Sequence, residues 1–237
     1  MTLELMMIRE EGIVLYMPEY ASVRVIECSP PSWMVLLALE EKSLPYKCQE
    51  LSFARGEHRS PEMLARNPRG TIPVLSDREF QLFETYAIFS YLEYAYPSKP
   101  LAPQETNEHV YAILRLHESS HLKSHGMALF AYLMKTPEEA LDKDILRERK
   151  DQFVNELRFW EDYLEGRDWL AGTSISYADL SVFTYIATAV HLGLSLQTTF
   201  PRLAAFVERM KQRPAVQKTW PALWNTNHYS FLSDEGA

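Results

Sequence analysis

Apolar and polar positions follow two alternating periods over the first hundred residues. Short β-branched runs bounded by prolines or turn residues predict strands, and longer runs with apolar residues on one helical face predict helices. The clearest helical stripe consists of Ala87, Ile88, Tyr91, Leu92 and Ala95. The predicted elements are strands at 22–27, 46–51, 72–75 and 80–83 and helices at 33–42, 62–66 and 85–96. This β-α-β-α-β-β-α order predicts a small α/β domain.

A proline-rich connector divides the chain. Pro97, Pro100 and Pro103 lie close together, which ends a helix and makes a stiff, exposed linker. After this connector the apolar positions follow the helical period, and no convincing strand is found. The pattern therefore predicts an α/β domain followed by an all-helical domain.

Capping sequences mark helix starts in the second half. Residues 136–139, TPEE, form a capping box with proline at the first helical position. Residues 176–179, SYAD, form a second box, in which Asp179 replaces the usual glutamate or glutamine. Pro201 opens a further predicted helix, and Pro214 closes it.

Composition and charge narrow the class of protein. The chain has 237 residues and a net charge of −8 at pH 7, which argues against a nucleic-acid or membrane partner. No apolar run reaches the roughly 18–20 residues of a membrane span, and the start, MTLELMMIREEG, lacks the basic region of a signal peptide. Cys28 and Cys48 are too few for a disulfide framework. We therefore expect a cytoplasmic globular protein with two reduced thiols.

The segment HESSHLKSH, residues 117–125, contains the His-Glu-x-x-His pattern of zinc proteases. A zinc site needs a third ligand, and a common continuation of this motif requires glycine at 124 and histidine at 127. The chain has Ser124 and Met127 at these positions. We therefore predict no metal site.

A turn followed by a proline-containing strand is the first candidate for binding chemistry. In NPRGTIPVL, residues 67–75, the strand begins with Ile72 and Pro73. Proline cannot donate a ladder hydrogen bond, which indicates a sheet edge or a bent segment, with a cis peptide bond as one form of it. An edge would leave the main-chain groups of Ile72 free to pair with an extended peptide-like ligand.

A strand-to-helix transition is the second candidate. In FETYAI, residues 83–88, Glu84 and Thr85 lie where the predicted strand ends and the helix starts. The free N–H groups of a helix start suit a carboxylate, and Glu84 suits an amine. Together these groups predict a site for the α-amino-acid end of a small peptide.

With these segments the chain resembles the cytosolic glutathione transferases. Their thioredoxin-like domain carries N-P-x-G-x-[VI]-P, matched by residues 67–73, and E-S-x-A-I, matched by residues 84–88 with Thr85 in place of serine. The S-x-x-D cap at 176–179 is a further family feature. The resemblance runs from Val23 to Trp224 and implies an N-terminal thioredoxin-like α/β domain and an all-α C-terminal helical bundle.

This resemblance also implies the domain boundaries. We expect an N-terminal extension over residues 1–20, a thioredoxin-like glutathione-binding domain over 21–97, a linker over 98–106 and an all-helical domain over 107–237.

Residues 14–27 also imitate a family start, with Tyr16 or Tyr20 as a catalytic tyrosine. The family's interval to the motif proline favours Ser29, which lies 44 residues before Pro73 (73 − 29), over Tyr16, which lies 57 before it (73 − 16).

The resemblance assigns Ser29 as the catalytic residue. SPPSWMVLLALEEK, residues 29–42, is similar to the serine-type start of the zeta class and more closely to that of the rho class, as are residues 51–58 and 213–224. In such enzymes the serine hydroxyl donates a hydrogen bond to the glutathione sulfur. The hydroxyl and the helix dipole would stabilise thiolate over thiol, and the enzyme would position this nucleophile against an electrophile.

The same resemblance assigns the binding residues. Ile72 would pair with the cysteinyl backbone of glutathione, Glu84 and Thr85 would hold its γ-glutamyl end, and His58 would meet its glycine carboxylate. Thr71 departs from the lysine or glutamine often found there. The expected glutathione-binding residues are Pro31, Trp33, His58, Thr71, Ile72, Pro73, Glu84 and Thr85. The expected electrophile pocket contains His117, His121 and Trp224.

The implied function is conjugation of glutathione to hydrophobic electrophiles in detoxification. Glutathione is the co-substrate, no cofactor is expected, and the expected assembly is a homodimer. Three alternatives stay open: a zeta-like cis-trans isomerase, a thiol reductase based on Cys28, and a noncatalytic glutathione- or ligand-binding relative. Simpler interpretations of two residues also stay open, with Ser29 as a helix cap and His58 as a surface histidine. The face formed by His117, His121 and His125 lines the cleft, the subunit interface or solvent.

Overall fold

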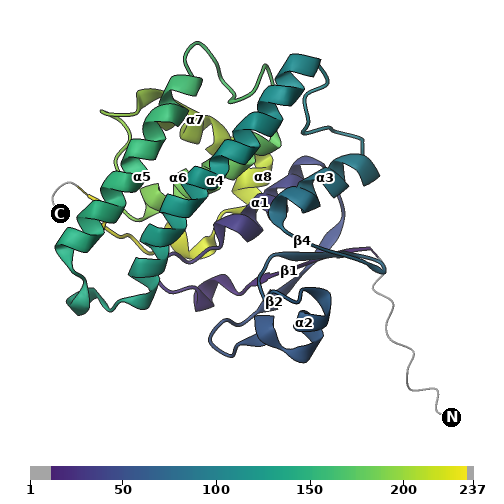
Figure 1. The fold of residues 1–237 in the computed structure, drawn as a ribbon, viewed down its shortest axis with the longest axis horizontal. Helices are drawn as coiled ribbons and strands as arrows, with labels where there is room; N and C mark the ends of the chain where they lie inside the picture. Colours follow the sequence, from purple (N-terminus) through teal and green to yellow (C-terminus); the bar gives the residue numbers. More distant parts are fainter. Residues whose placement is uncertain (1–11, 234–237) are drawn as a thin grey trace.

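The computed structural model describes residues 12–233, in which a sheet-containing part lies beside a helical part (Figure 1). The sheet has four strands in the order β2-β1-β3-β4. The strands are β1 (Ile13–Pro18), β2 (Tyr46–Leu51), β3 (Val74–Asp77) and β4 (Phe80–Phe83). β1 is parallel to β2 and antiparallel to β3, and β3 is antiparallel to β4.

Helices cover both faces of this sheet. They are α1 (Pro30–Glu41), α2 (Pro61–Arg66) and α3 (Thr85–Ala95). α1 and α3 lie on one face and α2 on the other (Figure 1). Alternate residues of β1 point to opposite faces: Leu15 and Met17 join the main core with α1 and α3, whereas Val14 and Tyr16 cluster with Met63 of α2. This arrangement confirms the predicted thioredoxin-like domain.

The first strand does not lie where the sequence pattern predicts it. Residues 22–27 form turns, since Val25 and Glu27 have φ angles of 68° and 52° that a strand does not allow. The strand is instead Ile13–Pro18, which pairs with both β2 and β3. The prediction that residues 1–20 are an extension outside the domain is therefore wrong for Ile13–Pro18, which form a strand of the sheet. Residues 1–11 lie outside the described part of the chain.

The predicted hairpin is present, and the segment before it is bent. The Ile72–Pro73 peptide bond is cis, and Pro73 immediately precedes β3. β3 lies between β1 and β4, so the prediction of a sheet edge at this position is wrong. The alternative prediction, a bent segment, is confirmed by the cis bond.

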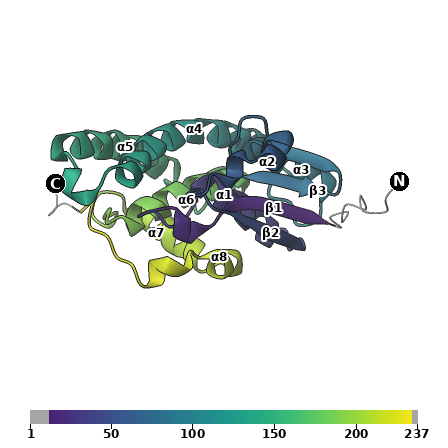
Figure 2. The same cartoon turned by 90° about the horizontal axis from the view of Figure 1, so that it is seen from below.

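The second part of the chain is helical, as predicted. Its helices are α4 (Thr106–Lys135), α5 (Lys143–Tyr163), α6 (Tyr177–His191), α7 (Pro201–Lys211) and α8 (Pro214–Thr219). Seen from below, α4 and α5 form an outer layer, α6 lies in the middle with α1, and α7 and α8 lie on the opposite side (Figure 2). No helix within residues 12–233 is both long and apolar enough to cross a membrane.

Of the two predicted capping boxes, one is present. Asp179 accepts hydrogen bonds of 2.8 Å from both the backbone N–H and the hydroxyl of Ser176, at the start of α6. The box at residues 136–139 does not form, because the N–H of Thr136 bonds to Tyr132 and ends α4. Asp142 caps α5 instead.

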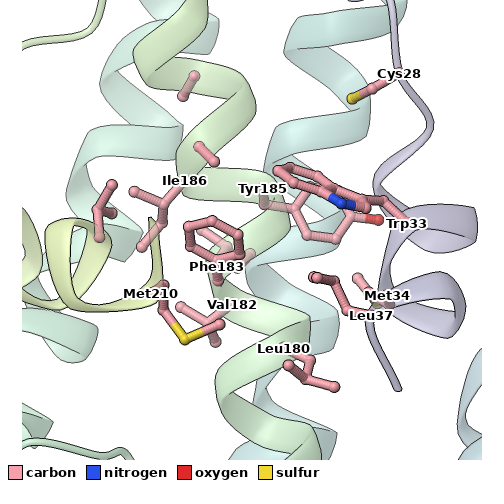
Figure 3. Packing of buried hydrophobic residues seen from close by; sticks show 14 of the residues in the cluster. Cys28, Trp33, Met34, Leu37, Leu180, Val182, Phe183, Tyr185, Ile186 and Met210 are labelled. Atoms are coloured by element: carbon pink, nitrogen blue, oxygen red, sulfur yellow. The ribbon is translucent and has the colours of Figure 1, made fainter. Parts of the chain in front are cut away.

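The hydrophobic core is continuous between the two parts. Trp33 of α1 is fully buried, and its ring centroid lies 5.3 Å from that of Phe183 in α6. Trp33, Met34 and Leu37 face the residues of α6 (Figure 3). Full burial of a large apolar side chain contributes roughly 1.5–3 kcal/mol, so this seam holds α1 firmly against the helical part.

Candidate active site

Ser29 occupies the N-cap of α1 without acting as a side-chain cap. Its backbone is extended (φ −131°, ψ 101°), and its carbonyl accepts a 2.8 Å bond from the N–H of Trp33. The hydroxyl makes no bond to a helix N–H and donates to the hydroxyl of Ser32 at 3.1 Å. Pro30 and Pro31 carry no N–H group. Ser29 is therefore half-buried at the helix start, and its hydroxyl does not cap the helix.

A cleft of about 140 Å³ lies beside this helix start, between the two parts of the chain. It is lined by Pro31, Met34, Glu84, Thr85, Tyr86, Ser120, Lys123 and Tyr185. Pro31, Glu84 and Thr85 were predicted site residues, and the fold brings these three together from α1 and α3.

Glu84 joins β4 to α3 in a strained conformation. Its φ and ψ angles are 69° and 113°, outside the regions that a non-glycine residue usually adopts. Its exposed carboxylate makes no cap bond with α3. The first N–H groups of α3, from Thr85 onward, have no partner within the helix. A free carboxylate thus lies beside a positive helix end, an arrangement that suits an ammonium and a carboxylate held side by side.

The buried side chain of Asn67 shapes the segment before the cis bond. Its amide donates to the carbonyl of Thr71 at 2.7 Å and to the hydroxyl of Thr71 at 3.0 Å, and its oxygen accepts from the N–H of Arg69 at 3.0 Å. The Thr71 hydroxyl is therefore engaged inside the turn. Ile72 is half-buried and directly precedes Pro73.

His58 lies in a short helical turn, Glu57–Arg59, on the loop after β2. Its ring contacts Phe53 edge to face, with centroids 4.5 Å apart, and its Nδ1 is buried without a hydrogen-bond partner in the described structure. Burial, and then the charge of Arg59, lower the pKa of His58 below its usual value of 6.5. A neutral imidazole is a hydrogen-bond donor for a carboxylate rather than a cation.

Trp33 does not lie where the predicted glutathione contact requires. Its side chain is fully buried among Phe183, Trp220 and Trp224. Its indole donates to Thr219, so neither surface nor donor is left for a ligand. The helical period places Trp33 on the face of α1 that meets α6, whereas Pro31 faces the cleft.

The expected electrophile pocket is also not assembled from its predicted residues. His121 lines a separate pocket of about 280 Å³ between α4 and α5, together with Glu156. Trp224 is buried and stacks on His191 with centroids 4.5 Å apart, beside a pocket of about 330 Å³ near α7. His117 lies edge-on to Tyr86 at 6.2 Å, close to the cleft. α4 turns Ser120 and Lys123 into the cleft and His121 toward α5.

The histidine-rich stretch forms no metal site. Among residues 12–233, no group of three His, Cys, Asp or Glu side chains is arranged to hold a metal ion.

Cys28 is buried beside α6. Its sulfur lies 3.4 Å from the Thr188 hydroxyl, and burial raises the pKa of the Cys28 thiol to about 12. The thiolate required for disulfide chemistry is therefore strongly disfavoured, and the reductase alternative is not favoured.

The cleft residues that sequence analysis missed are Met34, Tyr86, Ser120, Lys123 and Tyr185. Tyr86 directly follows the Glu84-Thr85 pair, which was a usable signal. Tyr185 gave no sequence signal, since it lies in an apolar stretch of α6. In the structure it is fully buried. A side-chain carbon at Gly126 would lie 2.9 Å from the Tyr185 ring, so a glycine in α4 makes room for this tyrosine.

Comparisons with known proteins identify the family of the chain. Residues 25–100 match the model for the N-terminal domain of glutathione S-transferases, and residues 123–219 match that for the C-terminal domain. The chain is 35% identical over 201 residues to glutathione S-transferase A of Pleuronectes platessa, covering 83% of this chain and 89% of that protein. It is 29% identical to human glutathione S-transferase theta-2B, over 77% of each chain.

A solved structure agrees along nearly the whole length. The crystal structure of a glutathione S-transferase from the Antarctic clam Laternula elliptica is similar with a TM-score of 0.80 and 32% identity, covering 94% of this chain and 99% of that one. With both domain models matched, a fold of thioredoxin-like and helical parts, and a cleft between them, the chain belongs to the glutathione S-transferase family and is an enzyme of that family.

Proposed function

We propose that this enzyme conjugates glutathione to hydrophobic electrophiles and that the Ser29 hydroxyl activates the thiol. The observation that carries the proposal is the Ser29 hydroxyl at the start of α1, which makes no cap bond to the helix and donates instead to the side-chain hydroxyl of Ser32. Pro31 of the same helix turn lines the cleft together with Glu84 and Thr85. The assignment to a serine-type class, most like rho, rests on the segment from Ser29 to Lys42.

Glutathione would bind with its γ-glutamyl end at the start of α3. Its carboxylate would accept hydrogen bonds from the N–H groups of Thr85 and Tyr86, and its ammonium would pair with Glu84. The backbone of Ile72, beside Pro73 at the bend before β3, would pair with the cysteinyl unit. His58 would donate to the glycine carboxylate, and the neighbouring turn holds Thr71 in place.

This placement directs the cysteinyl sulfur toward the start of α1. The Ser29 hydroxyl donates a hydrogen bond to the sulfur and, together with the N-terminal end of the α1 dipole, stabilises the thiolate. The thiol proton leaves to solvent, because a serine hydroxyl is a donor here and not a base. The thiolate then attacks the electrophilic carbon, and the leaving group departs with the electron pair of the broken bond.

The electrophile would enter the cleft from the side of α4. Met34 and Tyr185, both buried, form the apolar base of the cleft, and Ser120 and Lys123 line it with exposed polar groups. His117 lies close enough to Tyr86 to contact a large substrate. A cleft with an apolar base and a few polar groups suits a hydrophobic molecule with a polar activating substituent.

Two further parts of the proposal concern the state of the protein. Cys28 and Cys48 are both free thiols, which fits a reducing compartment such as the cytoplasm.

Large hydrophobic side chains of α3 and α4 are exposed, among them Tyr94 at 94% and Val110 at 58%. Exposed large hydrophobic side chains suit a protein interface, and we assign these to the interface of a homodimer.

Replacement of Ser29 by alanine tests the mechanism. A hydrogen bond to a charged group is worth about 1.5–3 kcal/mol, so Ser29→Ala is expected to lower kcat/KM for 1-chloro-2,4-dinitrobenzene by about 10- to 100-fold. The pKa of bound glutathione, measured from thiolate absorbance, is expected to rise by about 1–2 units.

Ser32→Ala is the matched variant. It removes the group that accepts from Ser29 and keeps the donor, so its effect on the thiol pKa is expected to be small. Equal losses in both variants, or an unchanged thiol pKa in Ser29→Ala, contradict the serine mechanism. Turnover of a cis-trans substrate without conjugation would identify the isomerase, and binding of glutathione without any turnover would identify the noncatalytic relative.

A further inference from the structure

The three residues before Ser29 are each bonded to the helical part of the chain. The indole of Trp224 donates to the carbonyl of Ile26 at 2.9 Å. The sulfur of Cys28 lies within hydrogen-bonding distance of Thr188 in α6. Between them lies Glu27, whose contacts link this loop to the C-terminal segment of residues 224–229.

Glu27 is held by two residues of that segment. Its Oε1 accepts hydrogen bonds from the amide of Asn227 and from the hydroxyl of Tyr229, the latter at 3.2 Å. The Glu27 residue is 7% exposed, and its backbone has a φ angle of 52°. Left-handed backbone costs energy for a residue with a side chain, so these contacts hold Glu27 in a conformation that the isolated loop would leave.

The second carboxylate oxygen of Glu27, Oε2, is not held by the C-terminal segment. Its Oε2 is buried without a hydrogen-bond partner within residues 12–233 and lies 3.6 Å from Nε2 of His191. Burial is the main cause that lowers the pKa of His191 to about 4, and the nearby His228 adds to it. His191 is therefore neutral near pH 7. A buried carboxylate needs hydrogen bonds to be tolerated, and Asn227 and Tyr229 supply them.

We propose that Glu27 is a positioning residue for Ser29, held in place by Asn227 and Tyr229. Glu27 lies two residues before Ser29, and its backbone conformation sets where the serine hydroxyl stands relative to the sulfur. The C-terminal segment is then a structural part of the thiol-activating site, although it does not line the cleft. This inference rests on the proposed role of Ser29.

The expected effect is on thiol activation rather than on glutathione binding. Glu84, Thr85 and Ile72, which are proposed to bind glutathione, do not touch the segment 224–229 in the described contacts. A displacement of about 1 Å at a reacting group costs up to ~100-fold in rate. Removal of the two donors to Glu27 is therefore expected to lower kcat and to leave the KM for glutathione nearly unchanged.

The experiment uses Tyr229→Phe, Asn227→Ala and the double variant in the full-length enzyme. The double variant is expected to lose on the order of 10-fold in kcat with 1-chloro-2,4-dinitrobenzene, with a KM for glutathione within about twofold of the parent. The pKa of bound glutathione, from thiolate absorbance, is expected to rise toward that of free glutathione. Ser233→Ala is the control, because its hydroxyl donates to the Ser230 carbonyl in the same segment and not to the loop.

Replacements of Glu27 separate its side chain from its backbone. Glu27→Gln keeps an acceptor for Asn227 and Tyr229 and is expected to keep most of the activity. Glu27→Gly allows the same φ angle without the side chain and is expected to behave like the double variant. Tyr229→Phe keeps the ring and all its packing, so it stays informative if the other variants fold poorly.

The outcomes separate this inference from the mechanism on which it rests. If Ser29→Ala raises the thiol pKa but the double variant does not, the positioning role is overturned and the serine mechanism stands. If Ser29→Ala leaves the thiol pKa unchanged, both are overturned. A loss of kcat matched by a rise in KM and a lower Tm, with no change in thiol pKa, would show a merely structural role and also overturn the inference.

Discussion

The indole nitrogen of Trp33 donates a 2.9 Å hydrogen bond to the hydroxyl of Thr219. Trp33 lies four residues after Ser29 in α1, and Thr219 is the last residue of α8. Both side chains are buried. The bond therefore joins the helix that carries the proposed thiol-activating serine to the end of the helical bundle.

Thr219→Val is expected to destabilise the protein by about 1–3 kcal/mol, because a near-isosteric side chain leaves the buried indole N–H without an acceptor. Urea unfolding measures the change. Thr184→Val in α6 is the control, since the buried Thr184 hydroxyl donates to the backbone carbonyl of Ser181. A loss in the control as large as in Thr219→Val would contradict the role of the indole bond.

Asp179→Ala is expected to destabilise the protein by more than about 2 kcal/mol. The buried Asp179 carboxylate accepts bonds from the N–H of Leu170 and from the N–H and hydroxyl of Ser176, and each unpaired buried donor costs about 1–3 kcal/mol. Asp162→Ala, which removes an exposed carboxylate on α5, is the control. Similar unfolding midpoints for the two variants would contradict this prediction.

The same carboxylate has a defined pH dependence. Burial is the main cause that raises the pKa of Asp179 from 3.8 to about 6. The folded state then binds the proton more tightly than the unfolded state, so the contribution of this group to stability falls as pH rises from about 4 to about 6. The loss caused by Asp179→Ala is therefore expected to be larger near pH 4 than near pH 7. Denaturant unfolding at both pH values checks this, and a gap that grows with pH contradicts it.

Cys28 is expected to resist alkylation in the folded enzyme. Burial raises the pKa of its thiol to about 12, so almost no thiolate is present near pH 7.5. Iodoacetamide followed by peptide mass spectrometry should find Cys28 unmodified in native protein and modified in denaturant. Equal labelling in both states would contradict the buried placement and revive the reductase alternative.

Ile113→Glu is expected to break the proposed homodimer. Ile113 is 47% exposed on α4, near the exposed Val110 and Leu114, and a buried unpaired charge opposes association. Light scattering after gel filtration should give half the parent mass. Phe159→Glu, at a 56% exposed residue on α5, is the control and should keep the parent mass. A parent mass for Ile113→Glu would exclude this face as the interface.

Local signals allowed much of the architecture to be predicted. The Ser176–Asp179 cap, the hairpin of β3 and β4, and the bend at Pro73 all depend on residues close together in the chain. The same holds for the Glu84–Thr85 transition into α3, which is part of the cleft. Short-range hydrogen bonds and the fixed geometry of proline act before any tertiary contact forms, so their sequence signals are dependable.

The remaining features depended on contacts between distant residues. The strand-like segment 22–27 forms turns and bends because β2 and β3 pair with Ile13–Pro18 instead, and a strand is stable only beside a partner. Trp33 and His121 do not lie at their predicted sites. Helix packing turns the face of α1 that carries Trp33 toward α6, and the face of α4 that carries His121 toward α5.

The two-part fold and the motifs at which glutathione is proposed to bind follow from the amino-acid sequence alone. Which side chains line the cleft, and the contacts of Asn227 and Tyr229 with Glu27 near Ser29, become visible only in the folded chain. The reason is physical: a motif encodes local backbone geometry, whereas the partner of a buried side chain is chosen by packing of segments that lie up to 202 residues apart.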